Sequence, residues 1–394
     1  MNFAQLGLIC AVAIAGPLLS LPRWLHLPVV VGELAVGLAL GATGLRVLHA
    51  DDPVFAFLAQ AGFALVMFVA GSHVPMRDRA LRAGLRSGLL RAVAVGVLAG
   101  GAGVGIAHAF GNHHGPLYAV LIASSSAGLV MPALSGVPLT APAVVAMLPQ
   151  IAVADAASIV ALPLAIDPRH APRAAVGAVV VAVAALLVWG VYRWAERSGR
   201  RKLVHTTSEE RKLALELRVM LAVLFGMAGL AQHVHVSVML AGFSLGLGVS
   251  AVGEPRRLAK QLFALTEGFF GPIFFVWLGT SLDLRDLIDH PSAVILGVVL
   301  GVAAVAVHGV MGLTGQPWPL AAITASQLGV PVAAAALGSQ LGVLAPGEST
   351  ALLLGALVTI AVTAGLTGRV TAIAIAGAPP QAKAKAGGGT AHAS

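Results

Sequence analysis

The sequence contains few of the residues that make a protein soluble. Only 10% of its 394 residues are charged, 5% are aromatic, and a single cysteine, Cys10, is present. One cysteine excludes a disulfide within the chain. Soluble globular domains carry about 25% charged residues. The shortage of charge therefore excludes a soluble globular protein of this length.

Apolar residues are abundant instead. They make up 58% of the chain, and the mean hydropathy is +0.92. Apolar runs of about 20 residues recur, and each is long enough to span ~30 Å of hydrocarbon. The chain is therefore predicted to be an all-α, polytopic membrane protein. Thirteen spans are expected, at 3–20, 28–47, 53–71, 88–109, 116–136, 141–166, 173–194, 213–231, 235–252, 261–280, 292–313, 317–340 and 347–374.

The basic residues indicate an orientation. The net charge of +8 would suggest nucleic acid as a partner in a soluble protein, but here Lys and Arg fall between or at the ends of the predicted spans. Of the 24, 20 fall on one side of the predicted membrane and 4 on the other. Lys and Arg concentrate in cytoplasmic loops. We expect a multi-pass protein of the cell membrane with the N-terminus outside, the C-terminus inside and no nucleic-acid partner.

The sequence also repeats itself. Three pairs of segments are similar, at offsets of 207, 208 and 201 residues. Two halves of six helices are therefore predicted, with the span at 173–194 between them. Corresponding helices are seven spans apart, so the halves have opposite orientations, which is typical of secondary transporters. The paired segments are 31–41 with 238–248, 63–79 with 271–287, and 122–132 with 323–333.

The third pair of segments carries glycine and proline in the middle of a span. The residues are Gly128 and Pro132 in the first half, and Gly329 and Pro331 in the second. Such interruptions expose backbone carbonyls and half-helix ends that can bind ions. A simple proline kink is the alternative. Their matching positions favour two discontinuous helices that form an ion site.

One acidic residue stands out by its depth. Asp155 lies near the middle of the span at 141–166 and is the only ionisable side chain in it. A carboxylate at that depth costs about 2.5–3.5 kcal/mol on insertion scales and usually marks an ion or proton path. We therefore predict that Asp155 binds the transported ion and the proton, with a structural carboxylate as the alternative.

Three stretches carry a resemblance to a known family. They are VVVGELAVGLALGATGL (29–45), FFGPIFFVWLGTSLDL (269–284) and SSSAGLVMP (124–132), the last followed by the Asp155 helix. Together they resemble the monovalent cation–proton antiporter-2 family, which has the sodium/hydrogen exchanger fold. The resemblance implies thirteen helices, two crossing broken helices, a homodimer, and elevator-like movement of a core against a dimerisation domain.

The resemblance also implies a domain plan. The transporter domain would be 1–377, followed by a Pro/Gly/Ala-rich tail, 378–394, that we expect to be disordered and cytoplasmic. Within the transporter domain, the core bundle would comprise 88–166 and 292–374. The dimerisation or scaffold segments would be 1–71 and 213–280, and the linker helix would be 173–194.

By the same resemblance, Asp155 matches the ion-binding aspartate of the family. Ser124, Ser125 and Ser126 match the polar run at the first broken helix, and Ser326 and Gln327 match the second. His308 falls where the family often has a membrane-embedded Lys or Arg. The chain departs from the family pattern at His308, at Ala154 before Asp155, and at Val330 after Gly329.

Other ionisable residues are given structural interpretations. Glu33 and Glu267 lie near predicted span ends, which favours interfacial or capping roles. A group of histidines is expected on the outer side and is interpreted as unconnected loop residues, with a metal site or an external pH sensor as alternatives. These histidines are His108, His113, His114, His233 and His235.

These observations lead to one principal functional hypothesis. The chain would exchange protons for Na⁺ or K⁺ at Asp155, with Ser125, Ser126, Ser326 and Gln327 completing the cation shell and His308 modulating the charge. No cofactor is expected. The alternatives are a sodium-coupled symporter of an organic anion and a non-transporting membrane sensor or scaffold. An enzyme is not expected, because no nucleotide-binding, zinc or catalytic-triad motif is found.

Overall fold

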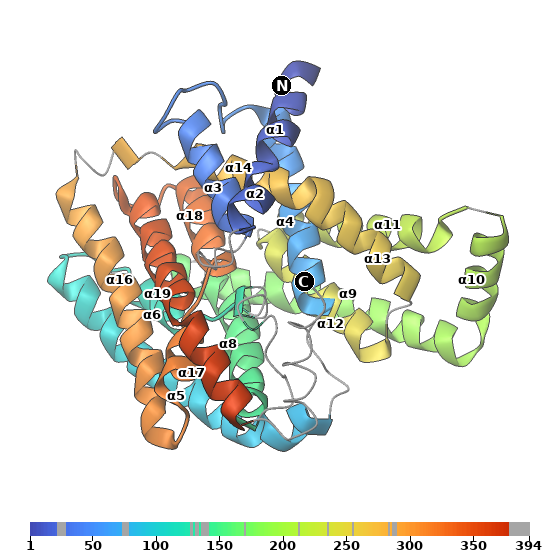
Figure 1. Ribbon diagram of the computed structural model, residues 1–394. Helices are drawn as coiled ribbons and strands as arrows, with labels where there is room; N and C mark the ends of the chain where they lie inside the picture. Colours follow the sequence, from blue (N-terminus) through green and yellow to red (C-terminus); the bar gives the residue numbers. More distant parts are fainter. Residues whose placement is uncertain are drawn as a thin grey trace, which may run out of the picture. The chain divides into compact units, whose positions relative to one another are not determined.

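The structure is a computed structural model, shown in Figure 1. It describes residues 1–21, 29–72, 79–126, 129–130, 134, 142–168, 171–211, 213–234, 236–253, 256–282, 284–285 and 290–377. Within these ranges the regular structure is helical, and no strand occurs. Eight of the described helices are long and apolar enough to cross a membrane, and four shorter apolar helices accompany them. The prediction of an all-α, multi-pass membrane protein is confirmed. The tail at 378–394 lies outside the described residues.

The chain divides into two compact units. Unit 1 contains the N-terminal helices and a central stretch of the chain (Figure 1). Its helices are α1 (Phe3–Ala13), α2 (Ala15–Ser20), α3 (Val29–Leu40), α4 (Pro53–Ser72), α9 (Ala171–Arg197), α10 (Arg200–Glu210), α11 (Leu215–His233), α12 (Val238–Val252), α13 (Arg256–Leu265), a π-helix (Thr266–Phe270) and α14 (Gly271–Ser281).

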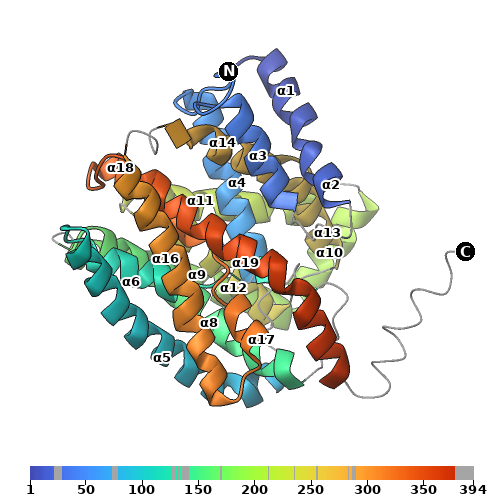
Figure 2. The same cartoon turned by 60° about the vertical axis from the view of Figure 1, so that its left-hand side comes forward.

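Unit 2 contains the helices from which the ion site is predicted. Within it, α16 packs along α19, and α5 packs against α6 and α8 (Figure 2). Its helices are α5 (Arg79–Ala109), α6 (Gly115–Ala123), α8 (Pro142–Ile166), α16 (Pro291–Gly309) with a 3₁₀ turn (Val310–Thr314), α17 (Trp318–Ile323), α18 (Gly329–Leu341) and α19 (Glu348–Gly377).

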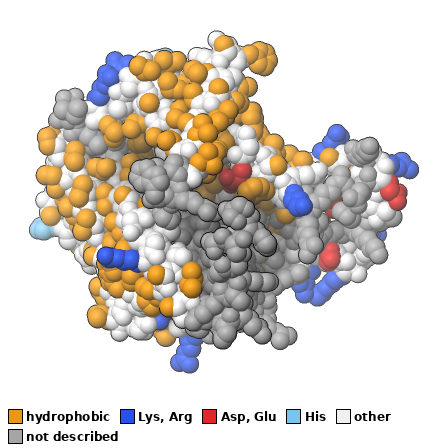
Figure 3. Space-filling model, in the orientation of Figure 1, with side chains coloured by type: hydrophobic (Ala, Val, Ile, Leu, Met, Phe, Trp, Pro, Cys, Tyr) orange, Lys and Arg blue, Asp and Glu red, His pale blue; other side chains and the backbone are white. Residues whose placement is uncertain are grey.

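Helix α10 was not predicted. Its sequence, RRKLVHTTSEE, is polar and was expected to form a loop between two spans. Arg, Lys, Leu and Glu favour helix, and the Ser208 hydroxyl then accepts a hydrogen bond from the backbone N–H of Leu215 (3.0 Å), which joins α10 to α11. Charged side chains gather around this helix, whereas hydrophobic side chains cover much of the other surface seen in Figure 3. Hydropathy alone missed it because the helix is not apolar.

In unit 1, α3 and α14 cross at glycines with almost no space between their backbones. A Cβ atom placed on Gly279 would lie 2.2 Å from the carbonyl oxygen of Leu34. It would also lie 2.9 Å from Leu38 N and 3.0 Å from Gly37 Cα. Distances this short are impossible for a real side chain, so only glycine permits this crossing. Close glycine contacts of this type are common between membrane helices.

A second crossing, between α4 and α12, has the same pattern. A Cβ atom placed on Gly71 would lie 2.4 Å from the carbonyl oxygen of Phe243, 3.1 Å from Leu247 N and 3.2 Å from Gly246 Cα. The same three kinds of atom therefore surround Gly71 and Gly279. Both crossings lie inside unit 1.

The two crossings correspond along the sequence. Gly71 and Gly279 are partners in the sequence repeat, at an offset of 208. The residues that contact Gly71 are Phe243, Gly246 and Leu247, and each lies 209 positions after its counterpart at Gly279, which is Leu34, Gly37 or Leu38. This offset is two residues longer than the offset of 207 at which the segments 31–41 and 238–248 were paired. The repeated segments thus make equivalent contacts.

Unit 2 is held together by similar close packing and by an apolar core. A Cβ atom on Gly88 of α5 would lie 2.7 Å from the backbone nitrogen of Gln150 on α8. A Cβ atom on Gly301 of α16 would lie 2.7 Å from the carbonyl oxygen of Gly355 on α19. Between them, a buried cluster joins α8, α17 and α19, with Met147 and Leu320 fully enclosed. This packing fixes the helices that carry the predicted site residues.

Candidate ion-binding site

The candidate site lies where two short helices of unit 2 end. Helix α6 ends at Ala123, and Ser124 is extended, with φ −70° and ψ 153°. Helix α17 ends at Ile323, and α18 begins at Gly329 after a non-helical stretch. Pro331 lies in the first turn of α18, where a missing N–H costs no helical hydrogen bond. The span at 317–340 is thus discontinuous.

The other two predicted break residues cannot be placed. Gly128 and Pro132 lie outside the described residues. In the predicted span at 116–136, the structure describes the N-terminal part of the break, at Ser124 to Ser126.

Asp155 lies in the middle of α8 and is 7% exposed. Helix α8 packs against α6, α17 and α18, the helices that border the two breaks. Ser158, three residues after Asp155, is 4% exposed and shares its face of the helix. The carboxylate is therefore enclosed within unit 2.

A chain of polar contacts links both breaks to α19. The Ser124 hydroxyl contacts Gln327 Oε1, and it also bonds the carbonyl oxygen of Leu121 (2.9 Å). The backbone N–H of Gln327 donates to the Thr359 hydroxyl on α19 (3.3 Å). The predicted residue Gln327 thus holds the first break, the second break and α19 together.

Two serines at the breaks have buried hydroxyls. Ser125 and Ser326 are each 1% exposed, and neither hydroxyl has a hydrogen-bond partner within the portion of the chain that the structure describes. They are partners in the sequence repeat, at an offset of 201. A buried hydroxyl without a partner costs about 1–3 kcal/mol. Ser126, by contrast, is half-buried and its carbonyl oxygen accepts from Val130 N (3.0 Å).

His308 lies on α16, which packs against both α6 and α17. It is fully buried, and its Nδ1 is 2.7 Å from the hydroxyl of Thr324, the residue that caps α17. Gln150 of α8 donates from Nε2 to the same hydroxyl (3.4 Å). The Nε2 atom of His308 is also buried, and it has no hydrogen-bond partner among the described residues. His308 thus connects α16 to the C-terminal end of α17.

Helix α19 carries a column of threonines. Their hydroxyls donate to carbonyl oxygens of their own helix: Thr359 to Ala356 (2.7 Å), and the next three each to the carbonyl four residues earlier (2.9 Å). The members at a spacing of four are Thr359, Thr363, Thr367 and Thr371. The first of them accepts the N–H of Gln327 and so joins this column to the site.

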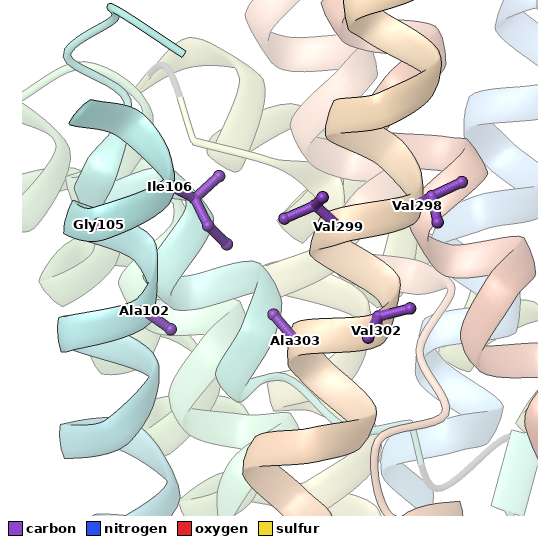
Figure 4. A pocket seen from close by; sticks show the side chains of 7 residues that line it. All are labelled: Ala102, Gly105, Ile106, Val298, Val299, Val302 and Ala303. Atoms are coloured by element: carbon purple, nitrogen blue, oxygen red, sulfur yellow. The ribbon is translucent and has the colours of Figure 1, made fainter. Parts of the chain in front are cut away.

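The groove between α5 and α16 in unit 2 is not the ion site. A groove of about 500 Å³ runs between α5 and α16, and Ile106 and Val299 point toward one another in it (Figure 4). Its lining residues are Ala102, Gly105, Ile106, Val298, Val299, Val302 and Ala303, none of which has a polar side chain. An apolar groove of this kind suits a lipid chain and cannot ligate a cation.

Two of the structural interpretations change. Glu33 is not interfacial: it is 4% exposed within α3, packs against Gly16, and interacts electrostatically with Glu267 of the π-helix in the same unit. His114 is not an unconnected loop residue, because its Nδ1 is 2.6 Å from Glu348 Oε1. Among the described residues, no group of three or more His, Cys, Asp or Glu side chains is placed to hold a metal ion.

The sequence prediction missed three residues of this hydrogen-bond network: Gln150, Thr324 and Thr359. Thr359 could have been found from the four-residue spacing of the threonines. Gln150 gave a weaker signal, as the only amide in the predicted Asp155 span. Thr324 lies two residues before Ser326, which the sequence had singled out.

The chain is similar to several known transporters. It is 29% identical over 335 residues to the Na⁺/H⁺ antiporter NhaS5 of Synechocystis, covering 79% of this chain and 45% of that protein. It is 28% identical over 294 residues to the glutathione-regulated potassium-efflux system protein KefC of Klebsiella pneumoniae, covering 68% and 44%. The chain thus spans about half the length of the curated relatives that it matches.

The fold has a solved counterpart. The structure of the sodium proton antiporter MjNhaP1 from Methanocaldococcus jannaschii matches with a TM-score of 0.63 and 16% identity, over 94% of this chain and 97% of that one. The model of the transmembrane sodium/hydrogen exchanger family matches residues 9–373. This family consists of transporters, in agreement with the expectation that the chain is not an enzyme. Nearly the whole chain is covered, and it therefore belongs to the sodium/hydrogen exchanger family.

Proposed function

We propose that the chain is a secondary active antiporter that exchanges protons for Na⁺ or K⁺ at Asp155. Relatives named as a Na⁺/H⁺ antiporter and as a potassium-efflux protein support the reaction class. The chain would act in the cell membrane as a homodimer, with the N-terminus outside and the C-terminus in the cytoplasm.

The observation that carries this proposal is the pair of buried serine hydroxyls. Ser125 and Ser326 lie at matching positions of the two breaks, and no hydrogen-bond partner is described for either. Hard monovalent and divalent cations prefer oxygen ligands. A cation that bound the Asp155 carboxylate and both hydroxyls would give Ser125 and Ser326 a partner. Ser126 and Gln327 would supply further oxygens, because both flank these serines.

Competition for one carboxylate is sufficient for exchange. A buried carboxylate is costly unless its charge is compensated, so the empty site takes up a proton or a cation. The protonated site and the cation-loaded site can each cross, whereas the empty ionised site cannot, because a bare carboxylate is too costly in the membrane. Each cycle would then return one proton for one cation.

The two units suggest how the site would be carried across the membrane. The predicted core segments, 88–166 and 292–374, fall in unit 2. The described residues of the predicted dimerisation segments, 1–71 and 213–280, fall in unit 1 together with the linker helix. We infer that unit 2 moves as an elevator against a static unit 1. The matching crossings at Gly71 and Gly279 support the inverted repeat on which this movement depends.

Cation choice and dependence on the site can be tested together. We expect Na⁺ or K⁺ alone, without an organic solute, to drive proton movement in proteoliposomes that contain the purified protein. Proton movement that requires an organic anion would contradict antiport and favour symport. No ion flux at all, with a folded protein, would favour a sensor or scaffold.

Removing the serine hydroxyls should weaken cation binding. Ser125→Ala and Ser326→Ala should each raise the cation concentration for half-maximal exchange by about tenfold or more, since a hydrogen bond or ion contact to a charged group contributes roughly 1.5–3 kcal/mol. The concentration dependence of proton release measures this. Ser281→Ala is the matched control, because the Ser281 hydroxyl already bonds its own helix (2.7 Å). Wild-type affinity in both site variants would rule out these ligands.

One carboxylate also predicts electroneutral exchange. An imposed membrane potential should leave the turnover rate unchanged, because no net charge moves. One net charge would be worth about 2.3 kcal/mol per 100 mV. Strong stimulation by the potential would contradict this prediction and indicate that a second group carries a proton. His308→Gln identifies that group, since stimulation that disappears in this variant assigns the second proton to His308.

A further inference from the structure

A second ionisable cluster of unit 2 lies away from the ion site. The carboxylate of Glu348, the first residue of α19, is almost fully buried. His114 Nδ1 lies 2.6 Å from Glu348 Oε1, and the Tyr118 hydroxyl donates to the same oxygen (2.6 Å). The backbone N–H of Ala345 donates to Oε2 (2.8 Å). These bonds join the start of α6 to the start of α19.

This cluster has one route to water. The Glu348 side chain is 3% exposed, whereas the His114 side chain is 22% exposed. Tyr118 is buried and is held in place by Asn112, whose Nδ2 donates to its hydroxyl (2.8 Å). A proton therefore reaches the buried carboxylate through His114.

The charge of His114 decides how well the carboxylate is compensated. Among the described residues, the ion pairs include no Lys or Arg bound to Glu348. The other ionisable side chains described near these helix ends are His108 and His113, in or before the same connection, and His290, before α16. A buried carboxylate is stable only when it is paired and hydrogen-bonded. Protonated His114 supplies the missing positive charge.

We propose that His114 and Glu348 form a proton-binding site, separate from Asp155, that makes transport sensitive to the pH on the side opposite the basic loops. The orientation predicted from Lys and Arg makes this the external side. Protonation of His114 would close a clamp between α6 and α19, and deprotonation would loosen it.

The clamp is connected to the ion site through the two helices that it joins. From His114 to Ser124, α6 rises by about 15 Å, and from Glu348 to Thr359, α19 rises by about 16 Å. The Ser124 hydroxyl donates to the side-chain oxygen of Gln327, and the Thr359 hydroxyl accepts from the backbone N–H of Gln327. A shift of α6 relative to α19 at the clamp therefore changes the position of Gln327 and the adjacent serines. The clamp lies entirely within unit 2, so it regulates the site itself.

The direction of the pH effect follows from the hydrogen bond. Contact with the Glu348 carboxylate raises the pKa of His114 above its ordinary value of about 6.5, against the opposing effect of burial. A group with a raised pKa in the folded state stabilises the protein fully below its unfolded pKa. That stabilisation is lost as the pH rises through the folded pKa. The clamp is therefore closed at acidic pH and loosens at alkaline pH.

The test uses the full chain and three variants. The pH of each compartment of proteoliposomes is varied separately while exchange is measured for wild type, His114→Gln and Glu348→Gln, with His113→Gln as the control. His113 is the exposed neighbour in the same connection. The exchange rate of the wild type and of the control should change as the pH on one face passes the pKa of His114. Neither His114→Gln nor Glu348→Gln should show this change. An unchanged pH profile in His114→Gln would overturn the proposal.

A second measurement does not depend on transport. Ring resonances of histidine, assigned by comparison with His114→Gln, report the pKa of His114 directly in the purified protein. Glu348→Gln should return that pKa toward 6.5, which a purely structural role for Glu348 would not require. A His114 that titrates at or below 6.5 in the wild type would also overturn the proposal. If exchange is absent altogether, the proposed function fails while this titration still decides on the proton site.

Discussion

Asp155→Asn should eliminate proton release on addition of Na⁺ or K⁺. The amide keeps the shape of the side chain, but it cannot take up a proton in this pH range and carries no charge for a cation. Asp155 is 7% exposed, and its helix packs against α6, α17 and α18. Proton release from wild type and variant, measured on the same preparation with each alkali cation, gives the result.

Two variants sharpen this experiment. Asp155→Glu keeps the carboxylate and should retain partial exchange, because only its reach changes. Asp51→Asn replaces an exposed carboxylate outside the spans and should behave as wild type. Wild-type exchange by Asp155→Asn would contradict the assignment of the shared site, whatever the family of the protein.

Gly279→Ala should destabilise the protein far more than the addition of one methyl group suggests. The new Cβ would lie 2.2 Å from the carbonyl oxygen of Leu34, so α3 and α14 would have to separate. Overpacking of this kind typically costs about 1–3 kcal/mol and sometimes more. Gly71→Ala should have a similar effect, because Gly71 makes the equivalent contacts with α12. Thermal unfolding of the detergent-purified protein, and its recovery as a single species, measure this.

A glycine in open space provides the control. No atom lies within 4 Å of a Cβ placed on Gly226 of α11. Gly226→Ala should therefore be neutral or stabilise the helix by about 0.5–1 kcal/mol, since alanine favours helix over glycine. Equal stability of Gly226→Ala and Gly279→Ala would show that the close crossing is not needed.

Much of the fold could be predicted from the sequence because the membrane limits what a chain can do. Every apolar run must satisfy its backbone within a helix. Hydropathy therefore located helices such as α4, α9 and α19 within a few residues. It failed at α10, which is stabilised by helix propensity and capping and not by burial.

The site was predictable where sequence neighbours carry the signal. Asp155 was predicted from its depth in a span, and Ser125 and Ser326 were predicted from the resemblance to the family. The bond between His114 and Glu348 spans 234 residues, and the one between Gln150 and Thr324 spans 174. Neither has a local pattern, because each depends on which helices pack together. Only the packed helices bring these side chains into contact.

The threonines of α19 have a consequence for the choice between cation and anion transport. A hydroxyl has a single hydrogen, and each of these four commits it to its own helix. The hydroxyls of this column can therefore only accept hydrogen bonds from a neighbour, as Thr359 accepts from the backbone N–H of Gln327. Lone pairs attract a metal ion or a donor group and repel a carboxylate. At Thr359, where this column meets Gln327, the helix is thus suited to positive solutes and unsuited to organic acids.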